Sequence, residues 1–402
     1  LGTVCVAGCG KLNINYAAQE MKVGNVTVKQ GDYISIDGFT GEVINGKVET
    51  KPSEILQVVI DGTLKASDSE LFEDYNNIMI WADEIRTLGV RTNADQPDQC
   101  ENAIKFGAEG VGLCRTEHMF FGGDRIKAVR EMILSENVEG RKKALAKLLP
   151  MQRDDFTGIF KAMEGYPVTI RLLDPPLHEF LPTKQTEIEE LSRDMNVSME
   201  DLNHKVKSLH EFNPMLGHRG CRLGITYPEI FDMQVQAIIE AAVEIKKSGK
   251  NIIPEIMIPL VGHVKEYQIL KQNAINVIKD VLAKAKVKME YKIGTMIEVP
   301  RAAMTADEIA AEAEFFSFGT NDLTQMGCGF SRDDSGSFLP EYVEKGIYDK
   351  DPFQSLDQDG IGRMMKYAIE YGRKVNPKLK IGICGEHGGD PDTVEFCHRI
   401  GL

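Results

Sequence analysis

From about residue 90 onward, short apolar segments alternate with amphipathic segments of helical period, and this alternation constrains the fold more than any other feature. Seven segments are predicted to be strands because they are short and rich in β-branched or aromatic residues. They are residues 90–92, 110–114, 168–173, 252–258, 293–299, 315–318 and 380–384. Repeated strand–helix units predict a parallel sheet, either doubly wound or closed as an eight-stranded barrel.

The segments between these strands carry helical patterns. Apolar residues recur at helical spacing over 70–89, 230–245 and 267–281, which predicts three amphipathic helices. The stretch 175–213 is too long for a simple connection, so we expect a helical insertion on the face that carries the strand ends.

The first fifty residues differ in composition because they are rich in turns and short β segments. Residues 33–36 and 42–44 flank a Gly-containing turn and predict a hairpin. So short a piece cannot bury enough surface to be stable alone. We therefore expect residues 1–50 to be the end of a larger β domain, 51–70 to be a linker, and 71–402 to form the barrel.

Composition excludes several classes of protein. The 402 residues contain 42% hydrophobic and 27% charged residues, which excludes an intrinsically disordered chain. A net charge of −14 argues against a nucleic-acid partner, and no apolar run approaches the ~20 residues that span a bilayer. Eight scattered cysteines favour reduced thiols in a cytoplasmic compartment.

Polar residues follow the predicted strands directly, and the carboxyl ends of parallel barrel strands open on one face, where active sites are built. The segments are Arg115-Thr116-Glu117, Asp174-Pro175-Pro176, Glu298, Asn321-Asp322 and Cys384-Gly385-Glu386-His387. Because several strand ends supply such groups together, we expect the candidate site there.

Glu298 and Asp322 are the candidate metal ligands. Two carboxylates, with the remaining positions left to water and substrate, suit Mg²⁺, with Mn²⁺ as an alternative. A lone carboxylate is more often a helix cap or an ion-pair partner. The turn containing Gly319 and Asn321 favours the functional interpretation, because its backbone N–H groups can bind an anion.

Arg115, Arg171 and Arg219 are the candidate anion-binding residues, because a guanidinium can hold a phosphoryl or carboxylate group with two hydrogen bonds. Arg171 lies inside an apolar strand, where an unpaired charge is costly, so it must face a polar interior. We expect Arg222 to be structural.

Cys384 lies at a strand end beside Glu386 and His387. Most buried cysteines act as small apolar residues, but a thiol of ordinary pKa, roughly 8.5, is protonated near neutrality and can donate a proton. His118 and His387 are expected to be loop or supporting residues more often than ligand contacts.

Several long motifs resemble the phosphoenolpyruvate-utilising enzymes, and the resemblance covers essentially the whole chain. Residues 314–325, which read EFFSFGTNDLTQ, are similar to the signature of that family. The finer motifs resemble its branch that couples ATP, phosphate and pyruvate. These motifs lie at 171–180, 213–220, 329–334 and 385–391.

The resemblance implies a fold and a set of roles. It implies a (β/α)8 barrel of the TIM type preceded by the end of a swivelling phosphohistidine domain. It also implies reversible phosphoryl transfer between that histidine and the enolate of pyruvate. The implied roles are Glu298 and Asp322 on Mg²⁺, Arg115, Arg171 and Asn321 on the phosphoryl group, Arg219 and Asp174 lining the site, the backbone amides of Thr320 and Asn321 on the anionic end of the substrate, and Cys384 protonating the enolate carbon.

The family pattern extends beyond both ends of this sequence. We therefore expect a fragment that lacks the carrier histidine and the nucleotide-binding domain, and the resemblance implies that the last barrel strand follows residue 402. Such a fragment keeps only the pyruvate/phosphoenolpyruvate half-site, and the family implies a homodimer. Alternatives are the branch that uses water, the branch that phosphorylates a carrier protein, and a barrel without catalysis. Cytosol, plastids and microbody-like organelles all fit the family.

Overall fold

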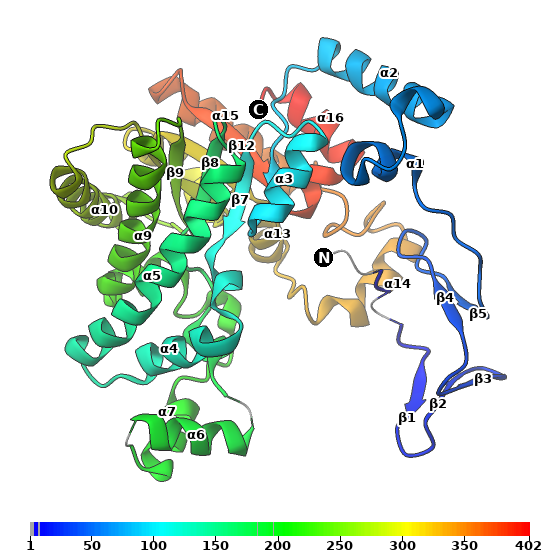
Figure 1. The fold of residues 1–402 in the computed structure, drawn as a ribbon, viewed down its shortest axis with the longest axis horizontal. Helices are drawn as coiled ribbons and strands as arrows, with labels where there is room; N and C mark the ends of the chain where they lie inside the picture. Colours follow the sequence, from blue (N-terminus) through cyan, green and yellow to red (C-terminus); the bar gives the residue numbers. More distant parts are fainter. Residues whose placement is uncertain (1–3, 7–8, 183, 196) are drawn as a thin grey trace. The chain divides into compact units, whose positions relative to one another are not determined.

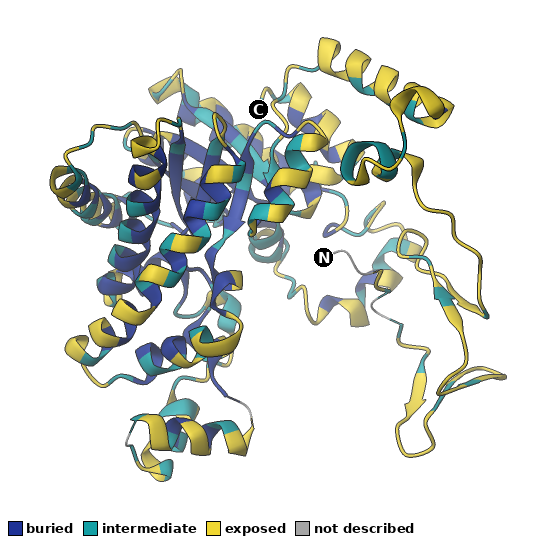
Figure 2. Cartoon of the chain, viewed as in Figure 1, coloured by how far each residue is buried: buried dark blue, intermediate teal, exposed yellow. Residues whose placement is uncertain are grey.

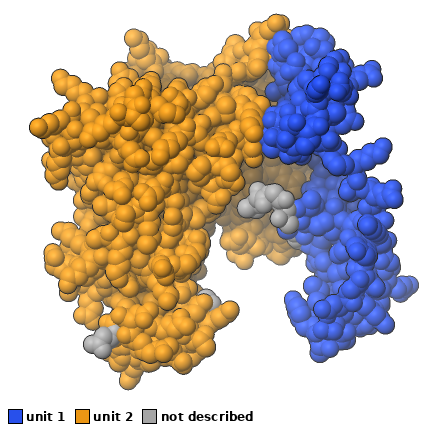
Figure 3. All heavy atoms as spheres, in the orientation of Figure 1, with its two compact units in different colours: residues 1–82 blue, residues 83–402 orange. Residues whose placement is uncertain are grey.

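The computed structural model describes residues 4–6, 9–182, 184–195 and 197–402. The chain divides into two compact units, Leu1–Ala82 and Asp83–Leu402, which Figure 3 colours separately. Each unit is described by itself below.

The first unit contains two small antiparallel sheets. Strands β1 (Asn13–Asn15), β2 (Glu20–Val23) and β3 (Val26–Lys29) form one sheet, which the sequence analysis did not predict. Strands β4 (Ile34–Ile36) and β5 (Val43–Asn45) form the predicted hairpin. No hydrophobic side chain in the described part of this unit is buried (Figure 2). Its origin in a phosphohistidine domain stays a prediction.

Short helical turns follow the hairpin, in the segment predicted to be a linker. They are α1 (Glu54–Leu56), the π-helical turn η1 (Gln57–Asp61) and the 3₁₀ turn η2 (Ala66–Asp68). Helix α2 (Glu70–Ile85) confirms the helix predicted from residue 70 onward, although it ends four residues before Gly89.

The second unit is built on one parallel sheet whose seven strands follow each other in chain order. The strands are β6 (Thr92–Asn93), β7 (Val111–Arg115), β8 (Pro167–Arg171), β9 (Ile253–Ile258), β10 (Lys292–Ile297), β11 (Phe315–Gly319) and β12 (Lys380–Cys384). All seven were predicted, but β6 is only two residues long. It begins at Thr92 because the backbone of Val90 is already bonded to Glu109.

The sheet curves into a nearly closed barrel of the TIM type, as predicted. Its edge strands β6 and β12 are not hydrogen-bonded to each other in the described chain. Inside the barrel, buried apolar side chains form a small cluster of their own: Leu113, Met257, Met296, Phe315 and Cys384. This cluster separates the two ends of the barrel interior.

Helices cover the outside of the sheet (Figure 1). The longest are α5 (Val138–Ala162), α9 (Pro228–Lys247) and α10 (Val264–Ala285); α9 and α10 contain the two predicted amphipathic stripes. The others are α3 (Pro97–Lys105), α4 (Gly123–Leu134), α8 (Gly220–Thr226), α11 (Pro300–Met304), α12 (Ala306–Ala310), α13 (Thr320–Cys328), α14 (Leu339–Glu344), α15 (Ile361–Val375) and α16 (Pro391–Arg399). In the described residues, no helix combines the length and the hydrophobicity that crossing a membrane requires.

The predicted insertion is helical. It contains α6 (Gln185–Met195) and α7 (Met199–Ser208), which project from the rest of the unit in Figure 1. Short 3₁₀ turns lie beside the strand ends: η3 (Thr116–Phe120), η4 (Leu177–Phe180), η5 (Pro214–Leu216), η6 (Ser335–Ser337) and η7 (Glu386–Gly389). These turns place the polar residues that follow the strands around one mouth of the barrel.

Candidate active site

A cavity of about 600 Å³ opens at the carboxyl ends of the strands. All nine residues predicted for the site line it: Arg115, Arg171, Asp174, Arg219, Glu298, Thr320, Asn321, Asp322 and Cys384. They come from β7, β8, β10, β11, β12 and the loop before α8, so the barrel geometry brings together residues that lie up to 269 positions apart (115 to 384). Their chemical roles remain proposals.

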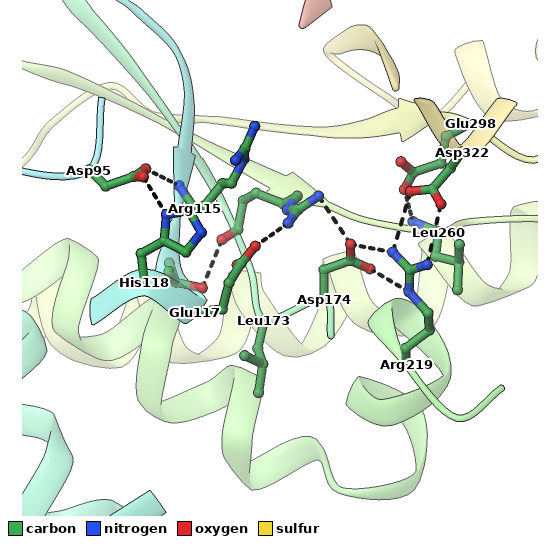
Figure 4. Close-up of polar contacts among 12 residues, drawn as sticks. Asp95, Arg115, Glu117, His118, Leu173, Asp174, Arg219, Leu260, Glu298 and Asp322 are labelled. Carbon is green, nitrogen blue, oxygen red and sulfur yellow. Dashed lines mark hydrogen bonds and ion pairs between the residues drawn. The ribbon is translucent and has the colours of Figure 1, made fainter. Parts of the chain in front are cut away.

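A chain of buried ion pairs runs across the floor of this cavity (Figure 4). Arg171 bonds to Glu117 on one side, and its Nη1 lies 3.0 Å from Asp174 on the other. Arg219 bonds to the same Asp174 and places its two terminal nitrogens 3.3 Å from the two carboxylate oxygens of Asp322. The arginine predicted to face a polar interior therefore does so.

Asp174 holds the two central arginines together. Burial alone would raise the pKa of Asp174, but Arg171 and Arg219 outweigh burial and hold that pKa below its ordinary value. A buried ionised group of this kind fixes positions more than it adds stability, because desolvation offsets much of the attraction. Asp174 thus sets where both guanidinium groups lie.

At Glu298, in contrast to Asp174, the neighbouring arginines do not outweigh the effect of burial. It is fully buried, and its Oε1 accepts a 2.6 Å hydrogen bond from the backbone N–H of Leu260. Its Oε2 is buried without a hydrogen-bond partner in the described chain. Burial, reinforced by the negative charge of Asp322 and Asp174, raises the pKa of Glu298 well above its ordinary value. Gly319 packs against this carboxylate so closely that a Cβ there would overlap it.

This environment fits a divalent cation. Glu298 Oε2 and Asn321 Oδ1 are both buried oxygens without a partner in the described chain, and Asp322 lies beside them on the next residue of the helix. Hard oxygen ligands of this kind suit Mg²⁺. No group of three or more His, Cys, Asp or Glu side chains in the described residues is arranged to hold a metal. Water and substrate would have to complete the coordination.

The cavity lining also requires added positive charge before it can hold an anion. Four arginines line it, against eight carboxylates: Glu117, Asp174, Glu179, Glu298, Asp322, Asp333, Asp334 and Glu386. Arg171, Arg219 and Arg332 already bond to carboxylates. The partner of Arg332 is Glu386, at the rim of the cavity. An anionic ligand would therefore bind here most readily together with a cation.

Arg115 is the exception among these arginines. Its backbone N–H donates a 2.6 Å hydrogen bond to Asp95, but its guanidinium forms no ion pair with any described residue. Arg171 adds a second free donor, because its Nε is buried without a partner in the described chain. The guanidinium of Arg115 is therefore available to an anion that enters the cavity, and the unpaired Nε of Arg171 is a second donor in the cavity wall.

Cys384 closes the apolar side of the cavity. Its side chain is buried within the small apolar cluster of the barrel interior, and its Sγ–H points to the carbonyl oxygen of Phe318 at 3.6 Å. Burial raises the pKa of this thiol, although a hydrogen bond with Ser317 opposes the effect. The thiol is therefore neutral near pH 7 and can act as a proton donor.

Thr320 begins helix α13 and is fixed by His387. The Thr320 hydroxyl lies 2.7 Å from Nδ1 of His387, whose Nε2 lies 2.9 Å from the carbonyl oxygen of Pro352. Because burial lowers the pKa of His387, the ring is neutral, so Nε2–H donates to Pro352 and the hydroxyl donates to Nδ1. His387 is a supporting residue, as the sequence analysis expected.

The loop that carries Arg219 is held from two sides. Glu211 accepts a 2.7 Å hydrogen bond from the backbone N–H of His218, and it packs against Gly217, where a Cβ would overlap its carboxylate. Arg222 donates to the carbonyl oxygens of Leu216 at 2.8 Å and Gly217 at 2.7 Å. Arg222 is thus structural, as expected, and its structural role serves the site.

The sequence analysis assigned no role to three site residues. Glu117 pairs with Arg171, Asp95 bonds to the turn after β7, and Glu211 holds the loop before Arg219. Glu117 and Asp95 both follow strands, so the rule that selected Arg115 could have selected them. Glu211 follows no strand, and only the folded loop reveals its contact.

Comparison with known proteins places the chain in a family. Residues 69–402 match the family described as "PEP-utilising enzyme, PEP-binding domain". Over its whole length the chain is 54% identical to a pyruvate, phosphate dikinase of Clostridium symbiosum, and 51% identical to that of Rhizobium meliloti and to a chloroplastic pyruvate, phosphate dikinase of Arabidopsis thaliana. It covers 44%, 43% and 40% of these relatives' lengths, respectively. The chain belongs to the phosphoenolpyruvate-utilising enzymes and carries their phosphoenolpyruvate-binding domain.

Proposed function

We propose that this chain carries the pyruvate/phosphoenolpyruvate half-site of a pyruvate, phosphate dikinase. The observation that supports this best is the pairing, in one cavity, of free anion donors on Arg115 and Arg171 with a buried neutral thiol on Cys384. Phosphoryl transfer to and from an enolate needs positioned positive charge at the phosphoryl group and a proton donor at carbon. The 54% identity to a relative of that name supports the same function.

Each residue of the cavity has a separate proposed role in the reaction. Arg115 and Arg171 hold the phosphoryl group of phosphoenolpyruvate while its P–O bond breaks and the phosphoryl group moves to a histidine acceptor. The electron pair stays on the enolate, whose C3 then takes the thiol proton of Cys384, giving pyruvate and a thiolate. A divalent cation at Glu298 and Asp322, Mg²⁺ by preference and Mn²⁺ as an alternative, would neutralise these carboxylates and polarise the substrate oxygens. The N–H groups of Thr320 and Asn321 face the anionic end of the substrate.

The complete reaction needs parts outside this sequence. The net conversion of ATP, phosphate and pyruvate to AMP, diphosphate and phosphoenolpyruvate requires a nucleotide-binding domain and a phosphohistidine domain as partners. We propose that the longer protein supplies both, and that this chain alone gives no net turnover. Synthesis of phosphoenolpyruvate from ATP by this chain alone would contradict the second proposal.

Exchange of the pyruvate methyl hydrogens with solvent tests the half-site by itself. The chain is incubated with pyruvate and Mg²⁺ in D₂O, and loss of the methyl proton signal is followed by NMR. Enolisation at C3 predicts exchange that depends on both protein and metal. Exchange at the rate of the protein-free control, in a sample whose circular dichroism shows it to be folded, would contradict the proposal.

Compartment and assembly are part of the same proposal. All eight cysteines are free, which favours a reducing compartment such as the cytoplasm. A homodimer is implied by the family resemblance alone, and sedimentation equilibrium would test it.

A further inference from the structure

His118 is a titratable residue of the cavity wall that the proposed mechanism does not use. It lies three residues after Arg115, on the turn η3, and its side chain is 48% exposed at the cavity. Its Nδ1 lies 2.7 Å from Oδ2 of Asp95, whose Oδ1 accepts the backbone N–H of Arg115 (Figure 4). One carboxylate therefore orients both the imidazole and the first residue of the anion-binding turn.

This hydrogen bond fixes which nitrogen faces the cavity side. An ionised carboxylate only accepts hydrogen bonds, so Nδ1 of His118 carries the hydrogen that Asp95 receives. Nε2 has no partner among the described residues. It is the nitrogen left to contact a ligand.

We propose that His118, oriented by Asp95, is a further phosphoryl-binding residue of this cavity. The proposal rests on the proposed function, because it assigns His118 to the phosphoryl end of the substrate near Arg115. It makes His118 a residue that distinguishes phosphoenolpyruvate from ligands that share the carboxylate and enolate oxygens but lack the phosphoryl group.

The proposed contact of His118 with a phosphoryl oxygen requires a hydrogen on Nε2. With its hydrogen on Nδ1, the neutral ring has no hydrogen on Nε2 and cannot donate to a phosphoryl oxygen. The proposed contact therefore uses the ring with a hydrogen on both nitrogens: Nδ1–H on Asp95, from the loop after β6, and Nε2–H on the phosphoryl group.

Calorimetry of the full chain with two ligands tests the proposal. Mg²⁺ is held constant, and phosphoenolpyruvate or oxalate, which mimics the enolate without a phosphoryl group, is titrated. We expect His118→Gln to weaken phosphoenolpyruvate about tenfold, the scale of one charge-assisted hydrogen bond, and to change oxalate less than twofold. Asp95→Asn keeps an oxygen for the backbone of Arg115 and should give an intermediate loss.

The ratio of the two affinities separates a contact from a structural effect. His118→Gln should change the ratio of phosphoenolpyruvate affinity to oxalate affinity about fivefold or more, because only phosphoenolpyruvate carries the phosphoryl group. His204→Gln, at an exposed position on α7, is the matched control and should change nothing. Equal losses for both ligands, or an unchanged phosphoenolpyruvate affinity in His118→Gln, would overturn the proposal. Failure of the unaltered chain to bind oxalate would instead count against the proposed function.

Discussion

Two buried glutamates at opposite ends of the same barrel differ in the hydrogen-bond partners of their carboxylate oxygens. This difference distinguishes a structural glutamate from a candidate functional one. Glu255, on β9, shares its two oxygens among Arg91 at 2.8 Å, Thr169 at 2.8 Å and Lys380 at 2.6 and 2.7 Å. Glu298, just after β10, has one backbone N–H and an oxygen without a partner.

The two carboxyl groups titrate in opposite directions although both are buried. Burial tends to raise both pKa values. Lys380 and Arg91 overcome it and lower the pKa of Glu255, whereas Asp322 and Asp174 add to it and raise that of Glu298. Burial of a carboxylate is therefore no sign of a site by itself, whereas a buried carboxylate whose neighbouring cations do not outweigh its burial is a candidate. Glu255 instead ties together the two ends of an open sheet, because Arg91 precedes β6 and Lys380 begins β12.

Replacing Glu298 with Gln should have the largest effect on binding. The substitution keeps the shape and the acceptor for the N–H of Leu260 but removes the charge that a cation needs. We expect the affinity for oxalate in the presence of Mg²⁺ to fall at least about 100-fold, measured by calorimetry. Thermal stability should stay equal or rise, because an uncompensated buried carboxyl group is lost. A weakening below about threefold would remove Glu298 from the cation site.

Replacing Cys384 with Ala should affect chemistry without affecting binding. Loss of the proton donor should slow exchange of the pyruvate methyl hydrogens about 100-fold, within the range of general acid–base effects. Cys397→Ala, at a buried thiol on α16 outside the cavity, controls for loss of any buried sulfur. Equal exchange rates in the two variants would show that another group carries the proton.

Replacing Glu255 with Gln should lower stability and leave ligand binding unchanged, the opposite of the result expected for Glu298→Gln. Lys380 and Arg91 lose their carboxylate, and we expect the free energy of unfolding to fall by about 2 kcal/mol; this lies below the usual range for fully buried pairs because both cations are partly exposed. Urea denaturation measures this, and oxalate binding should stay within twofold. If Glu255→Gln stayed folded but lost oxalate binding, the distinction between a structural Glu255 and a functional Glu298 would be wrong.

The same glutamate predicts a pH dependence. The pKa of Glu255 is lowered from 4.5 in the folded chain, so its contribution is fully present above pH 4.5 and is lost as pH falls below that value. Unfolding free energy measured from pH 6 down to 3.5 should therefore fall less steeply in Glu255→Gln than in the unaltered chain. Identical slopes would contradict the lowered pKa.

A smaller effect is expected at Arg222. Arg222→Met leaves the carbonyl oxygens of Leu216 and Gly217 without their donor, which loosens the loop before Arg219. We expect a loss of phosphoenolpyruvate affinity of about fivefold, since roughly 1 kcal/mol is the usual net value of such hydrogen bonds. Arg222→Lys should recover part of it. An equal loss in both variants, with lowered stability, would indicate a general packing defect.

Much of this molecule could be predicted from its sequence because its signals are local. The strands at Ile253–Ile258 and Phe315–Gly319 are short, apolar and bounded by turns, and the polar residues that follow such strands must share one end of a parallel barrel. The candidate site residues other than Arg219 lie at or just after these strand ends, as that rule expects. The three-stranded sheet formed by Asn13–Lys29 was missed because its strands of three or four residues are exposed and carry little hydrophobic pattern.

The partners of the site residues could not be predicted, since they depend on contacts between distant segments. That Arg171 and Arg219 share Asp174, while Arg115 stays free, follows from the positions of two strand ends and the loop before α8. Likewise, Glu255 and Glu298 look alike in sequence, each in or after an apolar strand. Only the cations around each one, supplied from elsewhere in the chain, distinguish them.

The dependence of oxalate binding on Mg²⁺ tests the central claim most directly. Calorimetry of the unaltered chain with oxalate is carried out with and without Mg²⁺, beside Glu298→Gln and Glu255→Gln. The cation site at Glu298 predicts heat of binding only with Mg²⁺, lost in Glu298→Gln and kept in Glu255→Gln. No heat with Mg²⁺ in the folded, unaltered chain, or equal binding in both variants, would contradict it.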